Sequence, residues 1–402
     1  MNSGTCLRTP DDVLAEWAGE LGLDALGPGS LDDLYEDVER VISVGQVTPE
    51  LAGANARRIE SAANALGWSN EYLPRNASGC VGSGVCAFGC PTGAKQHTAI
   101  TYMERAHAAG SVTYAATRAD RVRVDKGRVR GVVARTEGGG KLEIRAPTVV
   151  VAAGTFHTPG LLAASGIRNE WLGENLSIHP ATGAWGVVAD EVGMGHGVPQ
   201  SLAIDEFAGD GLMLEGTSGP PSYMALSVPY NGQRNRELMA RYSNVVQFGL
   251  MVRDRSRGHV ATGRLARRSG TPLIRYDISR EDTQLVFTGI ERLAELLFAA
   301  GAERVITPIS GLPELRDGDL APLRATTPHP ARLKLMAFHP LGTARMAGSP
   351  DHGVLDANGR VHGTDGLFVA DGSAVPSSLG VNPQLTIMAL ATRLARHIHK
   401  EY

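Results

Sequence analysis

A glycine-rich segment near the C-terminus restricts the fold more than any other part of the chain. It reads GLFVADGSAVPSSLGVNPQLTIMALATRLA over residues 366–395. The apolar start predicts a buried strand, and the tight turn that follows contains Asp371. Pro383 suits the first turn of a helix that we expect over residues 384–399. The segment therefore predicts a strand, a turn and a helix whose first N–H groups favour developing negative charge.

A second strand–turn–helix unit is predicted in the first half of the chain. The run VVVAA is typical of a buried strand over residues 148–153. Gly154 ends this strand, and a helix begins near Gly160. Upstream, residues 112–145 alternate apolar and polar side chains and contain two glycine-rich turn signals. They predict a small antiparallel sheet that leads into the buried strand.

Length and charge narrow the class of protein. The chain has 402 residues, enough for two or three lobes with a sizeable core. Its 39 basic and 42 acidic residues give a net charge of −3, so nothing favours nucleic acid or an anionic membrane as partner. The uncharged run 146–167 contains three glycines and two prolines, so we expect no membrane span. The first residues show no signal-peptide pattern, and we expect a cytoplasmic location.

Two further motifs accompany the C-terminal segment. Residues 338–346 read FHPLGTARM, and residues 380–383 read GVNP. Together with the ADGS between them, they closely resemble the C-terminal signature of the glucose–methanol–choline (GMC) oxidoreductases. The resemblance implies an α/β, FAD-linked oxidoreductase fold with a discontinuous FAD-binding domain at residues 1–174 and 336–402. A substrate-binding domain with a mixed or antiparallel sheet would occupy residues 175–335.

The resemblance also implies a reaction. Family members oxidise an alcohol to an aldehyde or ketone while hydride passes to N5 of FAD. The matching catalytic positions are His339, as the base for the hydroxyl proton, and Asn382, as its hydrogen-bonding partner on the alcohol oxygen. Apolar runs in the middle region favour an apolar alcohol such as a fatty alcohol or sterol, although sugars stay open. Oxygen and other compounds stay open as the electron acceptor.

Other motifs imply where FAD would be held. Residues 149–167 resemble a second signature of the same family, and residues 173–180 read GENLSIHP and resemble a further family motif, in which we expect His179 to be structural. The implied FAD contacts lie near the N-terminus, after the buried strand and at the start of the last helix. They are Asn2, Ser3, Ala119, Gly154, Thr158, Pro159, Asp371, Gly372, Asn382, Pro383 and Thr386.

Three of the four cysteines lie close together in one loop. Cys80, Cys86 and Cys90 fall within the run CVGSGVCAFGCP, which is not the spacing of a disulfide framework. The run resembles the ferredoxin pattern C-x2-C-x2-C-x3-C-P with Ser83 in place of one cysteine. We expect these cysteines to shape a loop and no metal to be bound. The alternative is a three-iron cluster, which would make the chain an iron–sulfur flavin dehydrogenase subunit.

The start of the chain departs from the family pattern. Members open with a strand, a GxGxxG turn and a helix that together hold the FAD pyrophosphate. This chain begins MNSGTCLRTP and has no GxGxxG in such a context. We therefore expect a dinucleotide-binding domain that lacks its first βαβ unit, and a chain that does not retain FAD alone. A late gene start, a natural fragment and half of a split enzyme all stay open, and a non-catalytic fragment is the alternative function.

Overall fold

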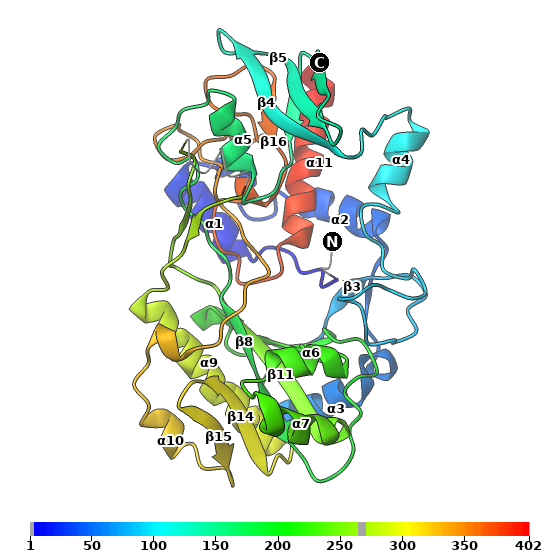
Figure 1. Ribbon diagram of the computed structural model, residues 1–402, viewed down its shortest axis with the longest axis vertical. Coiled ribbons are helices and arrows are strands. Elements are labelled where there is room, and N and C mark those ends of the chain that lie inside the picture. Colours follow the sequence, from blue (N-terminus) through cyan, green and yellow to red (C-terminus); the bar gives the residue numbers. More distant parts are fainter. Residues whose placement is uncertain (1–3, 264–270, 402) are drawn as a thin grey trace.

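The structure is a computed structural model that describes residues 4–263 and 271–401, which form two lobes stacked along the long axis (Figure 1). At the centre of the upper lobe, the C-terminal helix α11 (Gln384–Glu401) lies beside β7 (Val149–Val151) and β16 (Leu367–Val369). The two strands pair in parallel. Both predicted strand–turn–helix units are therefore confirmed, and strand pairing places them side by side.

The upper lobe buries its apolar side chains around α11. Leu385 and Ala389 of this helix are fully buried, as their spacing of four residues on one helical face requires. They share a core with Val369 of β16 and with Leu162, which lies in α5, the helix after β7. The other elements of this lobe are α1 (Asp11–Leu21), α2 (Asp32–Val41), α4 (Tyr102–Ala108), α5 (Thr158–Ala164), and the antiparallel strands β4 (Thr117–Asp125), β5 (Arg128–Thr136) and β6 (Lys141–Ile144).

The lower lobe contains a seven-stranded sheet in which every pairing is antiparallel. This agrees with the sheet expected for a substrate domain. In spatial order its strands are β15 (Leu312–Arg316), β14 (Arg304–Ile309), β8 (Ala181–Val187), β11 (Val245–Val252), β10 (Leu212–Glu215), β9 (Leu202–Ile204) and β2 (Glu71–Tyr72).

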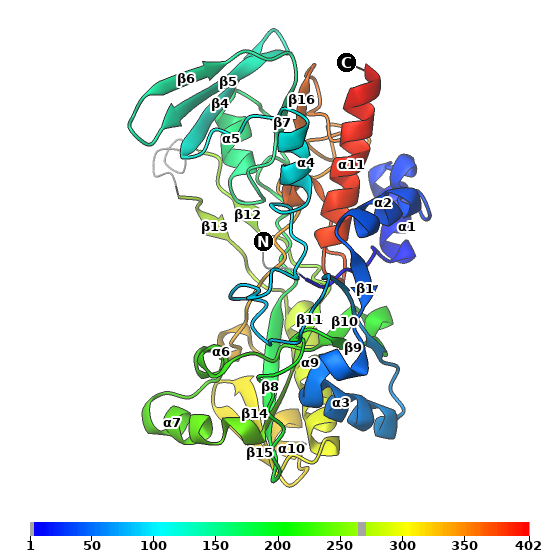
Figure 2. The ribbon, with the colours of Figure 1, turned by 90° about the vertical axis from the view of Figure 1, so that its right-hand side faces the viewer.

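Helices cover both faces of this sheet (Figure 2). Val246, Phe248 and Leu250 of β11 point to one face, whereas Val245 points to the other, as the two-residue period of a strand dictates. Ser279 caps α9 (Arg280–Ala299), where its hydroxyl accepts a hydrogen bond from the backbone N–H of Asp282. One face carries α3 (Pro49–Leu66) and α9 (Arg280–Ala299), the other α6 (Pro221–Ser227) and α7 (Gly232–Ala240), and α10 (Ala321–Arg324) lies at the edge strand β15.

Short segments connect the lobes. Although α3 and β2 precede residue 174, they pack with the lower sheet, so the chain crosses between the lobes early. The predicted division at 1–174, 175–335 and 336–402 stays a prediction. No helix of the described residues has the length and apolarity needed to cross a membrane. Two short antiparallel pairs lie near the junction: β1 (Val44–Gln46) with β3 (Pro74–Asn76), and β12 (His259–Val260) with β13 (Ile274–Arg275).

Candidate active site

The two predicted catalytic side chains lie together just before α11. Asn382 Nδ2 is 3.5 Å from His339 Nε2. Asn382 is buried, whereas part of the His339 side chain remains exposed. Burial of the ring, and secondarily the neighbouring His179, lowers the pKa of His339 to about 3. His339 is therefore neutral near pH 7, with a ring nitrogen able to accept a proton.

His179 connects the loops that carry these two side chains. Its ring packs edge-on against His339, with ring centroids 5.4 Å apart. Its Nε2 accepts hydrogen bonds from the backbone N–H groups of Leu379 and Gly380, each at 3.0 Å. Nε2 must therefore be unprotonated, and burial lowers the pKa of His179 to about 4. These are the contacts of a structural residue, as expected.

Other residues of the GENLSIHP segment fix the same loops. Asn175 Nδ2 donates to the carbonyl of Pro376 at 2.9 Å and to that of Gly342 at 3.4 Å. A Cβ at Gly342 would lie only 2.5 Å from the Asn175 carbonyl oxygen, so only glycine permits this approach. Asp254 accepts from the backbone N–H of His179 at 3.1 Å. The segment therefore connects the His339 loop, the Asn382 loop and the end of β11.

A buried carboxyl group that the sequence analysis missed touches Asn382. Glu215, the last residue of β10, is 6% exposed. Its Oε2 accepts from Asn382 Nδ2 at 3.3 Å, and its Oε1 accepts from Thr5 Oγ1 at 2.9 Å. Burial raises the pKa of Glu215. A single acid at the end of the apolar run LMLE was the available sequence signal, because glutamate is rarely buried without partners.

Asp371 joins the two strand–turn–helix units. Its Oδ2 accepts from the Gly154 N–H at 2.9 Å and from Thr158 Oγ1 at 2.6 Å. Its Oδ1 accepts from the backbone N–H of Ser373 at 2.8 Å and from the Ser373 hydroxyl at 2.5 Å. The carboxylate was expected to face cofactor hydroxyls. Here its oxygens hold the turns after β7 and β16 together, and its contact with FAD stays a prediction.

A cavity of about 510 Å³ lies along the turn after β7. Among the residues that line it are Ala119 of β4, His157, Gly160 and Val260. A Cβ added at Gly154 or Gly160 would meet no atom within 4 Å, so the backbone here borders open space. Residues 154–160, which we call the wall, contribute Gly160 to the lining of the cavity beside the predicted contact Ala119, and Gly154 begins this stretch. The open space here fits the close approach of a flat cofactor such as FAD.

The other predicted cofactor contacts differ in their surroundings. The Thr386 hydroxyl lies 2.6 Å from that of Thr9. A Cβ at Gly372 would lie 2.9 Å from Thr155 Oγ1, so this glycine faces protein. Both residues pack against the chain itself, and their contact with FAD stays a prediction. The remaining sites are Pro159 in the first turn of α5, Pro383 buried directly before α11, and Asn2 and Ser3, which lie outside the described residues.

The cysteine-rich loop packs on the lower lobe through its glycines. A Cβ at Gly84 would collide with the Gly195 carbonyl oxygen, which requires glycine in this tight contact. Cys80, Cys86 and Cys90 are free thiols of intermediate exposure. Throughout residues 4–263 and 271–401, no three His, Cys, Asp or Glu side chains are grouped so that they could hold a metal ion. The described structure therefore adds no support to an iron–sulfur cluster.

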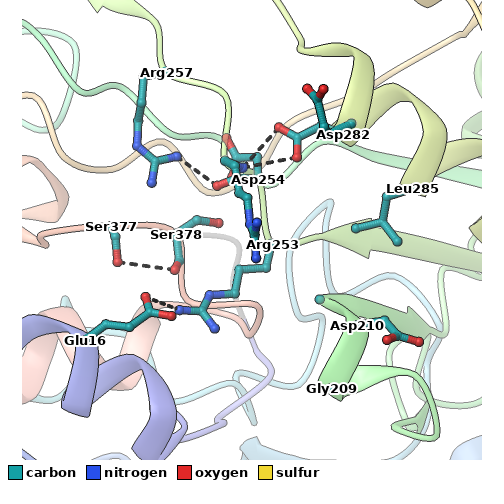
Figure 3. Close-up of a pocket in the computed structure, with 13 residues that line it drawn as sticks. Glu16, Gly209, Asp210, Arg253, Asp254, Arg257, Asp282, Leu285, Ser377 and Ser378 are labelled. Atoms are coloured by element: carbon teal, nitrogen blue, oxygen red, sulfur yellow. Dashed lines mark hydrogen bonds and ion pairs between the residues drawn. The ribbon is translucent and has the colours of Figure 1, made fainter.

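A smaller polar cavity of about 260 Å³ lies between the lobes (Figure 3). Arg253, directly after β11, pairs with Glu16 of α1 at 2.6 Å, and Arg257 donates to the Asp254 carbonyl at 2.8 Å. Because Asp254 also binds the backbone of His179, the wall of this cavity supports the segment that connects the two catalytic loops.

Comparisons with known proteins agree with this geometry. Two family models described as GMC oxidoreductase match residues 1–181 and 254–391. An uncharacterized GMC-type oxidoreductase of Sinorhizobium fredii is 32% identical over 98% of this chain and 78% of its own length. The chain therefore belongs to the GMC oxidoreductase family, whose members use FAD.

Other relatives are longer than this chain. Uncharacterized GMC-type oxidoreductases from two Mycobacterium tuberculosis strains are 39% identical over 98% of the chain, which spans 62% of their length. The long-chain-alcohol oxidase FAO3 of Arabidopsis thaliana is 28% identical over the whole chain and 57% of its own length.

Solved structures show the same fold. Pyridoxine 4-oxidase from Mesorbium loti superposes with a TM-score of 0.74 at 18% identity, covering 99% of this chain and 82% of its own. A formate oxidase superposes with a TM-score of 0.72 at 17% identity and the same coverage. These likenesses confirm the α/β GMC fold.

Proposed function

We propose that this GMC oxidoreductase oxidises the CH–OH group of an alcohol, with His339 as the proton acceptor and Asn382 as the donor to the alcohol oxygen. The observation that carries the proposal is the 3.5 Å separation of His339 Nε2 and Asn382 Nδ2. This distance is long for a direct N–H···N hydrogen bond. An oxygen about 2.9 Å from each nitrogen would complete a triangle, accepting from Asn382 and donating to His339.

Bound FAD would supply the acceptor for the hydride that leaves the alcohol carbon. The chain's own residues hold the alcohol oxygen and remove its proton. Neutral His339 takes that proton at Nε2; its lowered pKa leaves this nitrogen unprotonated near pH 7 but also makes the ring a weaker base, so the proton moves as hydride leaves the carbon. Asn382 stabilises the charge that develops on the oxygen as the O–H bond weakens. Ala119 and Gly160, which line the cavity, and Gly154 in the turn that leads into it would hold the cofactor.

The substrate that we propose is an apolar alcohol. Phe338, directly beside His339, is 60% exposed, and Phe88 is 61% exposed while its ring contacts Tyr223 of α6 at 6.3 Å between centroids. Of these two side chains, Phe338 adjoins the proposed proton acceptor, and a large apolar side chain exposed there favours contact with an apolar substrate. The relatives from Arabidopsis thaliana whose name is long-chain-alcohol oxidase support the same choice.

The proposal is tested with His339→Ala in the flavin-loaded protein. We expect turnover of a panel of alcohols, measured with a dye acceptor, to fall about 100-fold or more because the proton acceptor is lost. Flavin absorbance should be retained. His362→Ala is the matched control, since the His362 side chain hydrogen-bonds only to the Ala347 carbonyl in the described structure. Turnover within a fewfold of wild type in His339→Ala would show that His339 is not the base.

A further inference from the structure

Glu215 is the acidic residue that contacts Asn382 of the proposed catalytic pair from the sheet of the lower lobe. β10 pairs with β11 and β9 on its two sides, and Glu215 lies opposite Gly249 and Ala203. A Cβ at Gly249 would lie 2.5 Å from Thr217 Cγ2, so the backbone around the glutamate is tightly packed. The sheet thus holds this carboxyl group in one place beside Asn382.

The hydrogen-bond partners of Glu215 form a directed chain. Arg75 Nη1 donates to the carbonyl of Gln200 at 3.0 Å and lies 3.4 Å from Thr5 Oγ1. The Thr5 hydroxyl donates to Glu215 Oε1, and Asn382 Nδ2 donates to Oε2. If the carboxyl group takes up a proton, Thr5 can accept it on the Oε1 side. In both protonation states Oε2 remains the acceptor that faces Asn382.

This chain fixes the orientation of the Asn382 amide. An acceptor opposite the amide requires its NH2 group there, since a carbonyl oxygen in that place would face another oxygen. One hydrogen of Nδ2 points to Glu215, and Nδ2 lies 3.5 Å from His339 Nε2, where the alcohol oxygen would bind. Asn382 Oδ1 has no hydrogen-bond partner within the described residues, so no other side chain there holds the amide from its opposite end.

We propose that Glu215 is a positioning residue for alcohol oxidation, which acts by holding the Asn382 amide so that its second N–H points at the substrate oxygen. This inference rests on the proposed function. The N–H···O bond to substrate strengthens as negative charge develops on the oxygen, so correct orientation matters most in the transition state. Loss of Glu215 should therefore lower kcat more than it raises KM.

Kinetics of the flavin-loaded protein test the proposal through a double-mutant cycle. Glu215→Leu should lower kcat about tenfold or more, whereas Glu215→Gln, which keeps an acceptor for Asn382, should stay within about threefold of wild type. In an Asn382→Ala background, Glu215→Leu should change kcat less than about twofold, because its effect is transmitted through the missing amide. Glu314→Leu, a carboxyl of β15 in the same sheet paired with Arg304 and bonded to Tyr230, is the control for loss of sheet stability.

A second measurement does not depend on turnover. In protein with 15N-labelled asparagine, the Asn382 side-chain amide should exchange its hydrogens faster in Glu215→Leu but not in Glu215→Gln. Equal effects of Glu215→Leu with and without Asn382, or unchanged amide exchange, would overturn the positioning role. If Asn382→Ala and His339→Ala themselves leave turnover unchanged, the proposed function fails instead, so the two failures are distinguishable.

Discussion

The corner that we propose to be catalytic and the wall that we propose to hold the cofactor are built in opposite ways. At the corner, formed by the His339 loop and the Asn382 loop, buried side chains such as Asn175 and His179 bind the backbone of both loops. Along the wall after β7, an added Cβ at Gly154 or Gly160 would meet nothing within 4 Å. The corner is therefore held by hydrogen bonds within the protein, whereas the backbone of the wall borders open space.

The difference follows from what each region has to do. Proton transfer depends on the placement of two nitrogen atoms around one oxygen, so the corner must hold its geometry before substrate arrives. A cofactor wall needs close backbone approach and space, which glycine supplies. Asp371 is one contact between them, because its carboxylate binds the Gly154 N–H of the wall and Ser373, which precedes the Asn382 loop. Thr155 is another, because it bonds to Pro340 and Thr343 of the His339 loop.

Asp371→Ala should give the largest loss of stability among these predictions, because it removes the contact with the most hydrogen-bond donors between the two regions. Four donors would lose their acceptor, and we expect the free energy of unfolding to fall by about 3 kcal/mol, the scale for leaving several buried polar groups unpaired. Urea unfolding followed by circular dichroism measures this loss. Asp190→Ala is the matched control, since that carboxylate is exposed and pairs only with Arg58 in the described structure, and its midpoint should barely move. An equal, small effect of both variants would contradict the role of Asp371.

The stability of the corner should also depend on pH, because His179 lies in it. Its pKa of about 4 lies below the value of about 6.5 for an unfolded histidine, so between these values the unfolded chain binds a proton that the folded chain does not. The stability from this residue is therefore present above pH 6.5 and lost as pH falls toward 4. Between pH 7 and pH 5 the loss should be about 2 kcal/mol.

His179→Asn isolates this contribution. Asparagine keeps an acceptor and tolerates the backbone φ of +51° at this position, but it does not titrate. The variant's free energy of unfolding should fall less than that of wild type between pH 7 and pH 5. The comparison is needed because Glu215, whose pKa is raised, contributes a pH dependence of the opposite sign to both proteins. Parallel pH curves for the two proteins would show that His179 binds protons alike in the folded and unfolded states, which would contradict a lowered pKa in the folded protein.

Local signals explain which parts of the fold were predicted from the sequence. Glycine and proline at the ends of apolar runs predicted the units around β7, β16 and α11. These features depend on neighbours in the chain. The packing of α3 and β2 on the lower sheet was not predicted, because it depends on strands more than a hundred residues further along.

The residues of the candidate site also fall into those with a local sequence signal and those that depend on distant partners. His339 and Asn382 were named from motifs, and their proximity was expected because both motifs occur in one signature. Glu215 was missed because it lies 167 positions from Asn382 and 210 from Thr5, so no local sequence pattern predicts that these residues are its partners. The hydrogen bonds that Gly154 and Ser373 donate to the Asp371 carboxylate were not predicted either. The sequence shows that an acid lies in a turn, but it does not show how many donors surround that acid in the fold.

The smallest expected effect tests the open region. Gly154→Val would place methyl groups in the space along the wall and force a β-branched residue to adopt a φ of +81°. We expect the Kd for FAD, from fluorescence titration, to rise about tenfold, or about 1.4 kcal/mol. Gly67→Val, at the end of α3 with a φ of +75° and equally open surroundings, imposes the same backbone strain away from the wall. It should weaken folding without changing FAD affinity. If both variants bind FAD equally, strain rather than occupied space explains any loss, and the wall after β7 does not hold the cofactor.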